Sequence, residues 1–259
     1  MPEDGLVVWP DNYLRKNAIW KDIAHNNLIL IGTVHGDPQG YERARALLDS
    51  LRPDLVTVEI SPFSLRYRQR YGAGWQRQLA QSLALAELPA DAARHLAIQR
   101  LTAQVALPFE VKAARDYHRR VGVPWRPLDL GFLSRRHLPR YGPELLSPAN
   151  LKALLTTPDG PLEEYVVAEF RRARLALVQS PRRFLSPGVS ETLRRERFIG
   201  RRLRQLASKH PRVVHLGGWE HLVDWQDSPG LWRALADLSP GRVLLDEADR
   251  ALDFSSERN

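Results

Sequence analysis

The sequence of 259 residues contains no cysteine. Disulfides and thiolate metal sites are therefore excluded, and any bound metal must be held by histidine, aspartate, glutamate, carbonyl oxygens or water. The chain also lacks any apolar run close to the roughly 20 residues that a membrane helix needs. Its first residues, Met-Pro-Glu-Asp-Gly, are acidic where a signal peptide would be basic. These absences predict a cytoplasmic protein that makes no contact with a membrane.

Positive charge is present in excess. The net charge is +8 at pH 7, and arginines account for most of it, concentrated in segments 66–70, 115–120, 135–140, 171–174, 182–183 and 194–204. Such a surface could attract nucleic acid, anionic lipid or an acidic substrate. However, the arginines recur at helical spacing between apolar residues, and no zinc-finger spacing or RNA-binding signature accompanies them. The pattern therefore favours solvated helix faces over nucleic-acid binding.

The chain alternates apolar runs with helical periodicity. The runs predict strands at 28–33, 55–60, 123–130, 212–216 and 242–246. Pro124 and Pro127 restrict the third of these to the edge of the sheet. Strands that alternate with helices indicate an α/β fold with a largely parallel central sheet covered by helices. We expect one domain over 1–259, with helical insertions, forming an added lobe, at about 75–121 and 134–207.

One motif occurs twice, 186 positions apart. Gly-x-x-His stands at residues 32–35 and again at 218–221, each time after a predicted strand. Parallel sheets bind ligands beyond the carboxyl ends of their strands. His35, Glu59, Asp129 and His221 all lie at such ends, so we expect them on one rim of the sheet.

Each of these residues also has a purely structural interpretation. A lone carboxylate at the end of an apolar strand is unfavourable unless it is paired, so Glu59 is either functional or bound to Arg66 or Arg195. Asp129 would either orient a histidine ligand or cap a turn. Asp37 precedes a proline, which is typical of a helix N-cap.

Two further residues near the second motif have open interpretations. Glu220 could act as a general base beside His221 or simply face solvent. His215 alternates within an apolar strand and is interpreted as a core histidine.

Four segments, 30–35, 53–59, 194–203 and 213–221, resemble the TraB/PrgY/GumN (Tiki-like) superfamily, which is related to the erythromycin esterase-like group. The resemblance covers about 28–221. It implies an active site of His35, Glu59 and His221, and a peptidase-like activity that uses a divalent ion such as manganese or cobalt. It also promotes Glu110 and Arg195 to candidate site residues.

The sequence departs from the family pattern in two places. The usual Glu-Arg-Asp or Glu-Arg-Asn reads Arg-Arg-Glu at 194–196, which leaves the role of that acid open. The signal peptide of the secreted branch and the carboxy-terminal membrane helices of the TraB/PrgY branch are both missing, which predicts a substrate reached from the cytosol.

A metal-dependent hydrolase is therefore the first functional hypothesis. Two neutral imidazoles and a carboxylate suit a divalent ion that activates water. Helix amino termini starting at 37–38 and 61–62 would direct amide donors to the same rim and favour an anionic small-molecule or peptide substrate. The alternative is a non-catalytic protein that binds a small ligand or peptide in the same pocket. A homo-oligomer is compatible with either.

Overall fold

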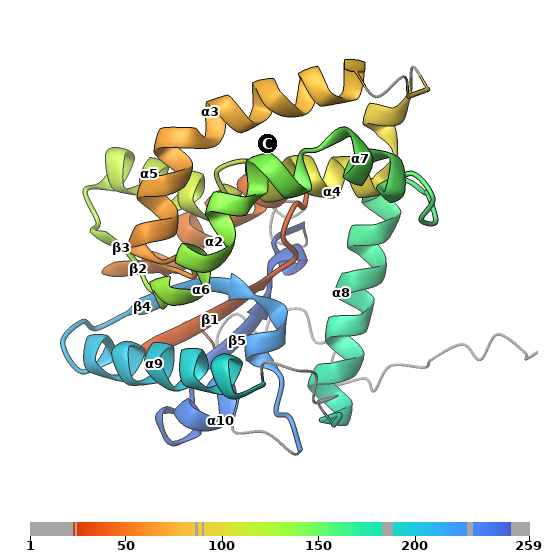
Figure 1. The fold of residues 1–259 in the computed structure, drawn as a ribbon. Helices are drawn as coiled ribbons and strands as arrows, with labels where there is room; N and C mark the ends of the chain where they lie inside the picture. The colour runs from red at the N-terminus through yellow and green to blue at the C-terminus, as the bar shows by residue number, and fades with distance from the viewer. Residues whose placement is uncertain are drawn as a thin grey trace, which may run out of the picture.

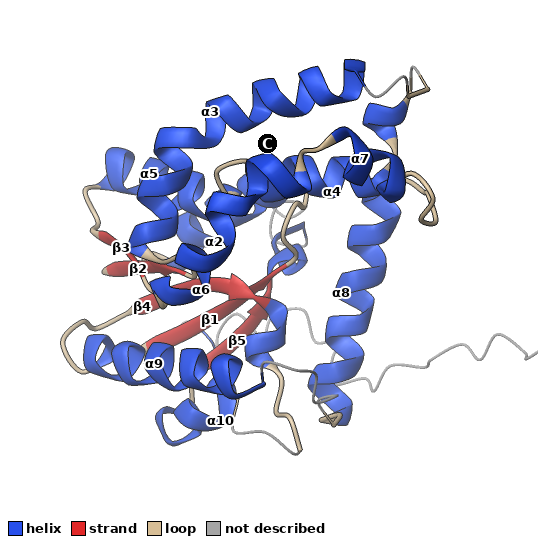
Figure 2. Cartoon of the chain, viewed as in Figure 1, coloured by secondary structure: helices blue, strands red, loops and turns tan. Residues whose placement is uncertain are grey.

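The computed structural model describes residues 23, 25–85, 88–89, 91–182, 189–226 and 230–249 (Figure 1). Within these ranges the strands form a single sheet: β1 (Leu28–Thr33), β2 (Leu55–Val58), β3 (Trp125–Pro127), β4 (Val213–Gly218) and β5 (Gly241–Leu244). The strand order is β3-β2-β4-β1-β5, and every pair is parallel. This confirms the predicted α/β fold with a parallel sheet surrounded by helices (Figure 2).

The strands form where the sequence has short apolar runs, in which leucine, isoleucine and valine recur. β1 is buried at all six of its positions and β2 at all four, which is typical of parallel strands that are covered on both faces. β2 ends at Val58, two residues earlier than predicted, because the chain turns there and the Ile60 amide donates to the Val58 carbonyl at 2.7 Å. β3 is a short edge strand, as its prolines predict.

The longer helices are α2 (Gly40–Leu51), α3 (Pro62–Leu85), α4 (Leu96–Val105), α5 (Phe109–Val121), α6 (Gly131–His137), α7 (Pro148–Leu154), α8 (Leu162–Gln179), α9 (Val189–Ala207) and α10 (Leu231–Leu235). Short helical turns are η2 (Ala92–Arg94), η3 (Leu138–Arg140), η4 (Tyr141–Leu145), η5 (Trp219–Leu222), η6 (Ala236–Leu238) and η7 (Leu245–Glu247). None of the helices in the described ranges combines the length and the hydropathy that crossing a membrane requires.

The connections place helices on both faces of the sheet. The path from β1 through β2 to β3 moves toward one edge, and α2 and α5 on this path pack against each other. The path from β3 through β4 to β5 moves in the opposite direction, and α9 and α10 pack against each other (Figure 1). Because parallel crossovers are right-handed, opposite directions put the two helix pairs on opposite faces.

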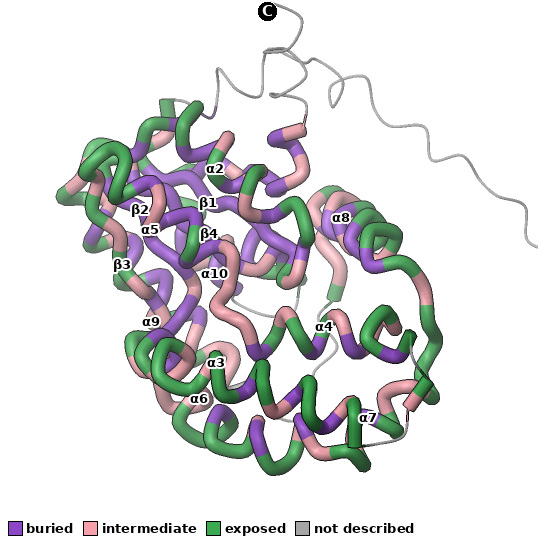
Figure 3. Tube along the Cα trace, turned by 90° about the horizontal axis from the view of Figure 1, so that it is seen from above, coloured by how far each residue is buried: buried purple, intermediate pink, exposed green. Residues whose placement is uncertain are grey.

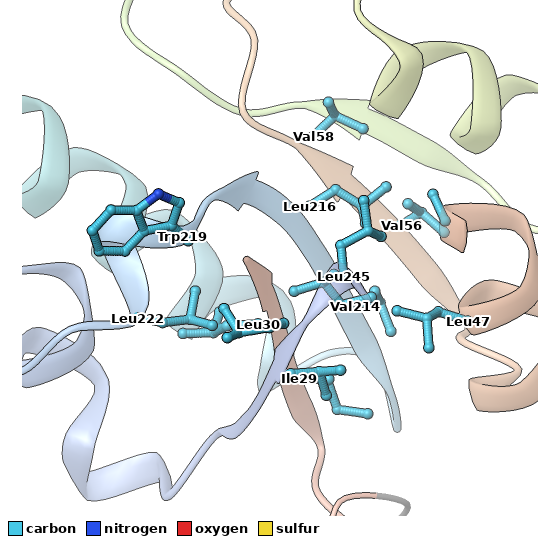
Figure 4. Close-up of a cluster of buried hydrophobic side chains, with 14 of the residues drawn as sticks. Ile29, Leu30, Leu47, Val56, Val58, Val214, Leu216, Trp219, Leu222 and Leu245 are labelled. Carbon is cyan, nitrogen blue, oxygen red and sulfur yellow. The ribbon is translucent and has the colours of Figure 1, made fainter. Parts of the chain in front are cut away.

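The main core lies between these helices and the three central strands. Figure 4 shows Leu30 of β1, Val56 of β2 and Val214 of β4 among its buried side chains, with Leu47 of α2 beside Val214 and Leu222 beside Leu30. Seen from above, the buried residues concentrate along β1, β2 and β4, whereas buried, intermediate and exposed residues alternate along α3, α7 and α8 (Figure 3). The sheet therefore holds its rim on a rigid base.

The predicted helical insertions contribute to two different cores. A second hydrophobic cluster joins α3, α4 and α7 to the short turns between α6 and α7, and its members are Trp75, Leu79, Ile98, Leu101, Val105, Leu138, Leu146 and Leu151. In contrast, α5, α8 and α9 contribute side chains such as Val111, Phe170 and Ile199 to the main core. We call α3, α4 and α7 the helical lobe.

Candidate functional site

The carboxyl ends of three strands lie side by side at one rim of the sheet. Thr33 of β1 is paired with Gly218 of β4, and Val58 of β2 is paired with Leu216. The connections from the adjacent strands β1 and β4 leave in opposite directions, which makes this the topological switch point where α/β sheets bind ligands. Both Gly-x-x-His segments begin at this point.

A cavity of about 1850 Å³ opens above the rim. The helical lobe and α8 form its far wall, and the rim forms its floor. The sequence-predicted residues on its surface are His35, Asp37, Glu59, Glu110, Asp129, Arg195, Glu220 and His221. The structure therefore brings most of the predicted site to one cavity.

His35 lies in the cavity with one buried carboxylate behind it. Its Nδ1 is 3.0 Å from Oε1 of Glu110, and the Thr33 hydroxyl donates to the same oxygen at 2.8 Å. The Glu110 side chain is buried, whereas the His35 side chain keeps 65% of its surface accessible. Glu110 thus fixes the inner nitrogen of the ring and leaves the Nε2 side toward the cavity.

His221 has the opposite surroundings. Its side chain is only 7% accessible, its Nε2 lies 3.0 Å from Oε1 of Glu59, and its Nδ1 lies 3.5 Å from Oε1 of Glu196. Glu196 is fully buried. Both ring nitrogens therefore face carboxylates, and the imidazole links the rim to α9.

Arg195 completes the network around Glu59. It donates to Oε1 of Glu59 and, through Nε at 2.7 Å, to Oδ1 of Asp129. The Gly218 amide donates to Oε2 of Glu59 at 2.6 Å. Of the two arginines that the sequence offers as partners for Glu59, the structure selects Arg195; Arg66 is exposed on α3 and does not line the cavity.

These contacts set the charge state of the site. Desolvation opposes a charged imidazole at His221, but Glu59 and Glu196 outweigh it and raise its pKa to about 9. Burial likewise opposes ionisation of Glu59, yet His221 and Arg195 hold its pKa well below the usual range. Desolvation also opposes a charged His35, and Glu110 nevertheless raises its pKa. Because His35 is largely accessible to water, solvent screening moderates that shift.

Glycines let the two motifs approach each other. A Cβ on Gly32 would come within 2.9 Å of the Trp219 Cα, closer than non-bonded atoms approach. A Cβ on Gly218 would lie 3.6 Å from His35 Nε2 and 3.7 Å from Glu59 Oε2. Gly218 therefore keeps a space of about one methyl group between the histidine and the carboxylate.

Two of the remaining predicted residues have local roles. Glu220 has an exposed side chain on the cavity surface, and its carbonyl accepts the Trp225 indole N–H at 3.0 Å. Asp37 accepts from the Gln39 amide at 2.9 Å and from Arg43 at 2.7 Å. The bond to Gln39 is the kind of contact that an N-cap makes, but α2 begins at Gly40 and not at the proline after Asp37. The Asp37 carboxylate closes a turn just before the helix instead.

Ser61 caps α3 as the sequence predicts. Its hydroxyl accepts from the Ser64 amide at 3.0 Å, and the proline that follows it is the first residue of the helix.

Three residues hold the site together through contacts that the sequence did not indicate. Thr33 stands at a variable position of the first Gly-x-x-His motif, and Glu196 is the acid of segment 194–196 whose role the sequence left open; both contact the ionisable groups directly. His215, interpreted as a core histidine, is buried directly beneath the rim, where its Nδ1 contacts the Thr57 hydroxyl at 2.9 Å and its Nε2 finds no hydrogen-bond partner in the described part of the chain. Burial lowers its pKa to about 3, so it stays neutral. Alternation with period two placed it in the interior but could not reveal its contact with the site.

The predicted metal ligands do not converge in this arrangement. His35 Nε2 and Glu59 Oε2 face a common space, but both nitrogens of His221 face carboxylates. In the described part of the chain, no group of three or more histidine, aspartate or glutamate side chains is placed to hold an ion. The three-ligand set does not fit the geometry, and a manganese or cobalt ion stays a prediction of the resemblance.

Comparison of the chain with protein-family models, with curated proteins and with solved structures finds no match. The resemblance to the TraB/PrgY/GumN superfamily therefore stays a hypothesis that depends on the four short segments. The geometry of the rim is the firmer basis for assigning a function.

Proposed function

We propose that this protein is a hydrolase in which His35 is the acid–base group of the reaction. One observation carries the proposal: an accessible imidazole, supported by the buried Glu110, faces the ionised Glu59 across Gly218 in a large cavity. A histidine whose inner nitrogen is held by a carboxylate is a recurrent arrangement for moving protons to and from water.

The proton steps depend on the two ring nitrogens of His35. When Nδ1–H is held by Glu110, a neutral ring presents Nε2 as a base toward the space beside Gly218. There Nε2 would take a proton from water while the water oxygen bonds to the substrate carbonyl carbon. The same proton would then pass to the leaving group as its bond to carbon breaks. Glu110 would stabilise the imidazolium that exists between these two steps.

Glu59, His221 and Arg195 have a positioning role in this scheme. Glu59 receives bonds from Arg195, His221 and the Gly218 amide, so its orientation is fixed at the rim. Arg195 also lines the cavity, so besides holding Glu59 it would stabilise the negative charge that develops on a carbonyl oxygen. We therefore expect His35 to contact substrate and His221 to act through Glu59.

The metal-dependent form of the hydrolase is a second candidate. His35 and Glu59 are the residues that would hold an ion, because their Nε2 and Oε2 atoms flank the space beside Gly218. A divalent ion would supply Lewis acidity there. Since ligation requires a neutral imidazole and Glu110 raises the pKa of His35, metal binding would release a proton and strengthen as pH rises.

The test is hydrolysis of a panel of peptide, ester and amide substrates by wild type, His35→Ala and Glu59→Gln, with and without added Mn²⁺ or Co²⁺. We expect His35→Ala to lower kcat by about 10²- to 10⁴-fold. Metal analysis of the same samples decides the second candidate. If no substrate is turned over while small anions stabilise the fold in a thermal-shift assay, the protein is a binder and the hydrolase proposal fails.

A further inference from the structure

The far wall of the cavity is strongly cationic. Among the described residues, the part of the lining that comes from α3, α4, α7, α8 and the residues after α8 contains four arginines, at positions 68, 100, 172 and 182, and a single carboxylate, Glu169. On the floor, Glu59 and Asp129 are bound to Arg195, Asp37 to Arg43 and Glu110 to His35, and among the described acidic residues there only Glu220 is exposed. The excess positive charge therefore lies on the wall that faces the rim.

Two of these arginines are held against aromatic rings along α8. The guanidinium of Arg100 lies 4.4 Å from the ring centre of Tyr165, and that of Arg172 lies 5.9 Å from the ring of Trp219. Stacking orients a guanidinium and leaves N–H groups available for a carboxylate; for Arg100, one of these groups is also within reach of the Tyr165 hydroxyl. Within the described chain, Arg100 forms no ion pair with a carboxylate, and Arg172 has a long contact of 3.6 Å with Glu169.

The two arginines mark a path to the rim. Tyr165, Glu169 and Arg172 recur at helical spacing on the cavity face of α8. Seven residues of helix separate Tyr165 from Arg172, about 10 Å along the axis, which equals about three residues of extended peptide. Trp219 belongs to the second Gly-x-x-His segment, so the Arg172 end of the path meets the catalytic rim.

We infer that this path, the Arg100–Arg172 track, binds an extended acidic peptide segment and delivers it to the rim. The inference deepens the proposed function by naming its substrate class, and it rests on that proposal for the fate of the peptide. Carboxylates of the peptide would pair with the two stacked guanidinium groups. Apolar wall residues such as Leu101 and Leu175 would contact the stems between them.

A nucleic acid fits the track less well. Single strands bind through aromatic rings on which bases stack. Here the Trp219 side chain is buried, and both Trp219 and Tyr165 already carry an arginine on the ring. The track therefore offers charge without a stacking surface, which favours carboxylates on a flexible chain.

The test is fluorescence polarisation with a labelled hexaglutamate peptide, compared with labelled hexalysine and a labelled six-nucleotide oligothymidylate. We expect hexaglutamate alone to bind, and to bind more weakly as salt rises. Arg100→Ala and Arg172→Ala should each weaken binding by about three- to tenfold. Glu169→Gln should strengthen it by about two- to threefold, because it removes the competing carboxylate.

Arg171→Ala is the matched control. Arg171 is the exposed neighbour of Arg172 on α8 and does not line the cavity, so its removal should leave hexaglutamate binding unchanged. Equal loss of binding in both variants would mean diffuse attraction to a basic surface and would overturn the track. Tighter binding of the oligothymidylate, or no binding of hexaglutamate, would also overturn it.

Binding and turnover are separated by His35→Ala. This variant should lose hydrolysis and keep hexaglutamate binding, since His35 lies on the floor and not on the track. If wild type hydrolyses a substrate but hexaglutamate binding is unchanged in Arg100→Ala and Arg172→Ala, the inferred track is overturned and the proposed function stands. Binding with the expected response but without hydrolysis of any substrate would support the track and refute the proposed function.

Discussion

The two Gly-x-x-His segments leave neighbouring strands one residue out of register, since Gly218 is paired with Thr33 and not with Gly32, and their histidines end in opposite surroundings. His35 is 65% accessible and has one buried carboxylate behind it, whereas His221 is 7% accessible and lies between two carboxylates. One imidazole can meet a substrate and the other cannot. Repetition of a motif in this chain therefore does not imply repetition of a role.

The backbone after each strand explains the difference. After β1 the chain continues to Gly36, whose φ of +85° reverses its direction, and His35 stays on the cavity side. After β4 the chain winds into the 3-10 turn η5, which rotates His221 toward the interior. The glycine that opens each segment makes room for a residue of the other segment. Gly32 allows close approach of Trp219, and Gly218 leaves space beside His35.

Alanine at the two histidines should give the largest separation of these roles. His221→Ala leaves Glu196 buried without its imidazole and should lower the free energy of unfolding by about 3–5 kcal/mol. His35→Ala should lower it by less, about 1–2 kcal/mol, because Glu110 loses its imidazole partner but still accepts from the Thr33 hydroxyl, and this variant should lose hydrolysis. Urea denaturation of both variants measures the free energy of unfolding, and initial rates measure hydrolysis.

Two outcomes would contradict this assignment. Equal destabilisation by both alanines would mean that His35 is as structural as His221. Full activity in a folded His35→Ala protein would remove it from the chemistry. His118→Ala is a matched control, because this histidine lies on α5 with its Nδ1 near the Val123 carbonyl and does not line the cavity.

Gly217 and Gly218 are consecutive residues at the start of the second segment, yet a side chain at each would meet different surroundings. A Cβ on Gly217 would lie 2.7 Å from Glu59 Oε2, whereas a Cβ on Gly218 would make ordinary contacts with His35 and Glu59. Gly217→Ala should therefore destabilise the fold by about 1–3 kcal/mol. Gly218→Ala should remain folded and lose activity, because its methyl group fills the space where water would be activated.

Thermal unfolding together with initial rates checks both variants. A Gly218→Ala protein with wild-type kcat would show that the reaction does not use the space between His35 and Glu59. A Gly217→Ala protein of wild-type stability would show that Glu59 can move without loss.

Most of the fold could be predicted because it depends on local patterns. The apolar run of β1, the prolines around β3 and the cap at Ser61 act over a few residues, so a single sequence reveals them. The parallel register then brings Glu59, Asp129 and both histidines to one rim, since strand ends of a parallel sheet lie together.

Contacts between distant segments could not be predicted in the same way. Glu196 reaches His221 only because α9 packs under β4, and His215 lies beneath the rim only because β2 and β4 are neighbours. The choice between Arg66 and Arg195 as the partner of Glu59 was open for the same reason. The burial of His221 depends on one turn of 3-10 helix, which no local pattern in the sequence indicates.

The pH dependence of stability should report the buried network. The pKa of His221 is raised from 6.5 to about 9, so its contribution is complete below pH 6.5 and is lost as pH rises through 9. The pKa of Glu59 is lowered below 4.5, so its contribution is present above pH 4.5 and is lost as pH falls. Between pH 6.5 and 9 we expect wild type to lose about 1–3 kcal/mol more than His221→Gln. Parallel curves for the two proteins would mean that His221 is neutral in the fold.

The smallest expected effect concerns the accessible histidine. Glu110 raises the pKa of His35, so the basic form of His35 should accumulate, and kcat/KM should rise, on the alkaline side of pH 6.5. Glu110→Gln removes the carboxylate charge but keeps an acceptor for Nδ1–H, and should move this rise down by about one pH unit. The plateau rate should fall as well, because the imidazolium formed during the reaction loses its counter-charge.

Thr33→Val removes the other hydrogen bond to Glu110 Oε1 without removing charge, and should shift the profile less. A profile that stays in place when Glu110 is neutralised would assign the titration to another group and leave His35 without its role as the base.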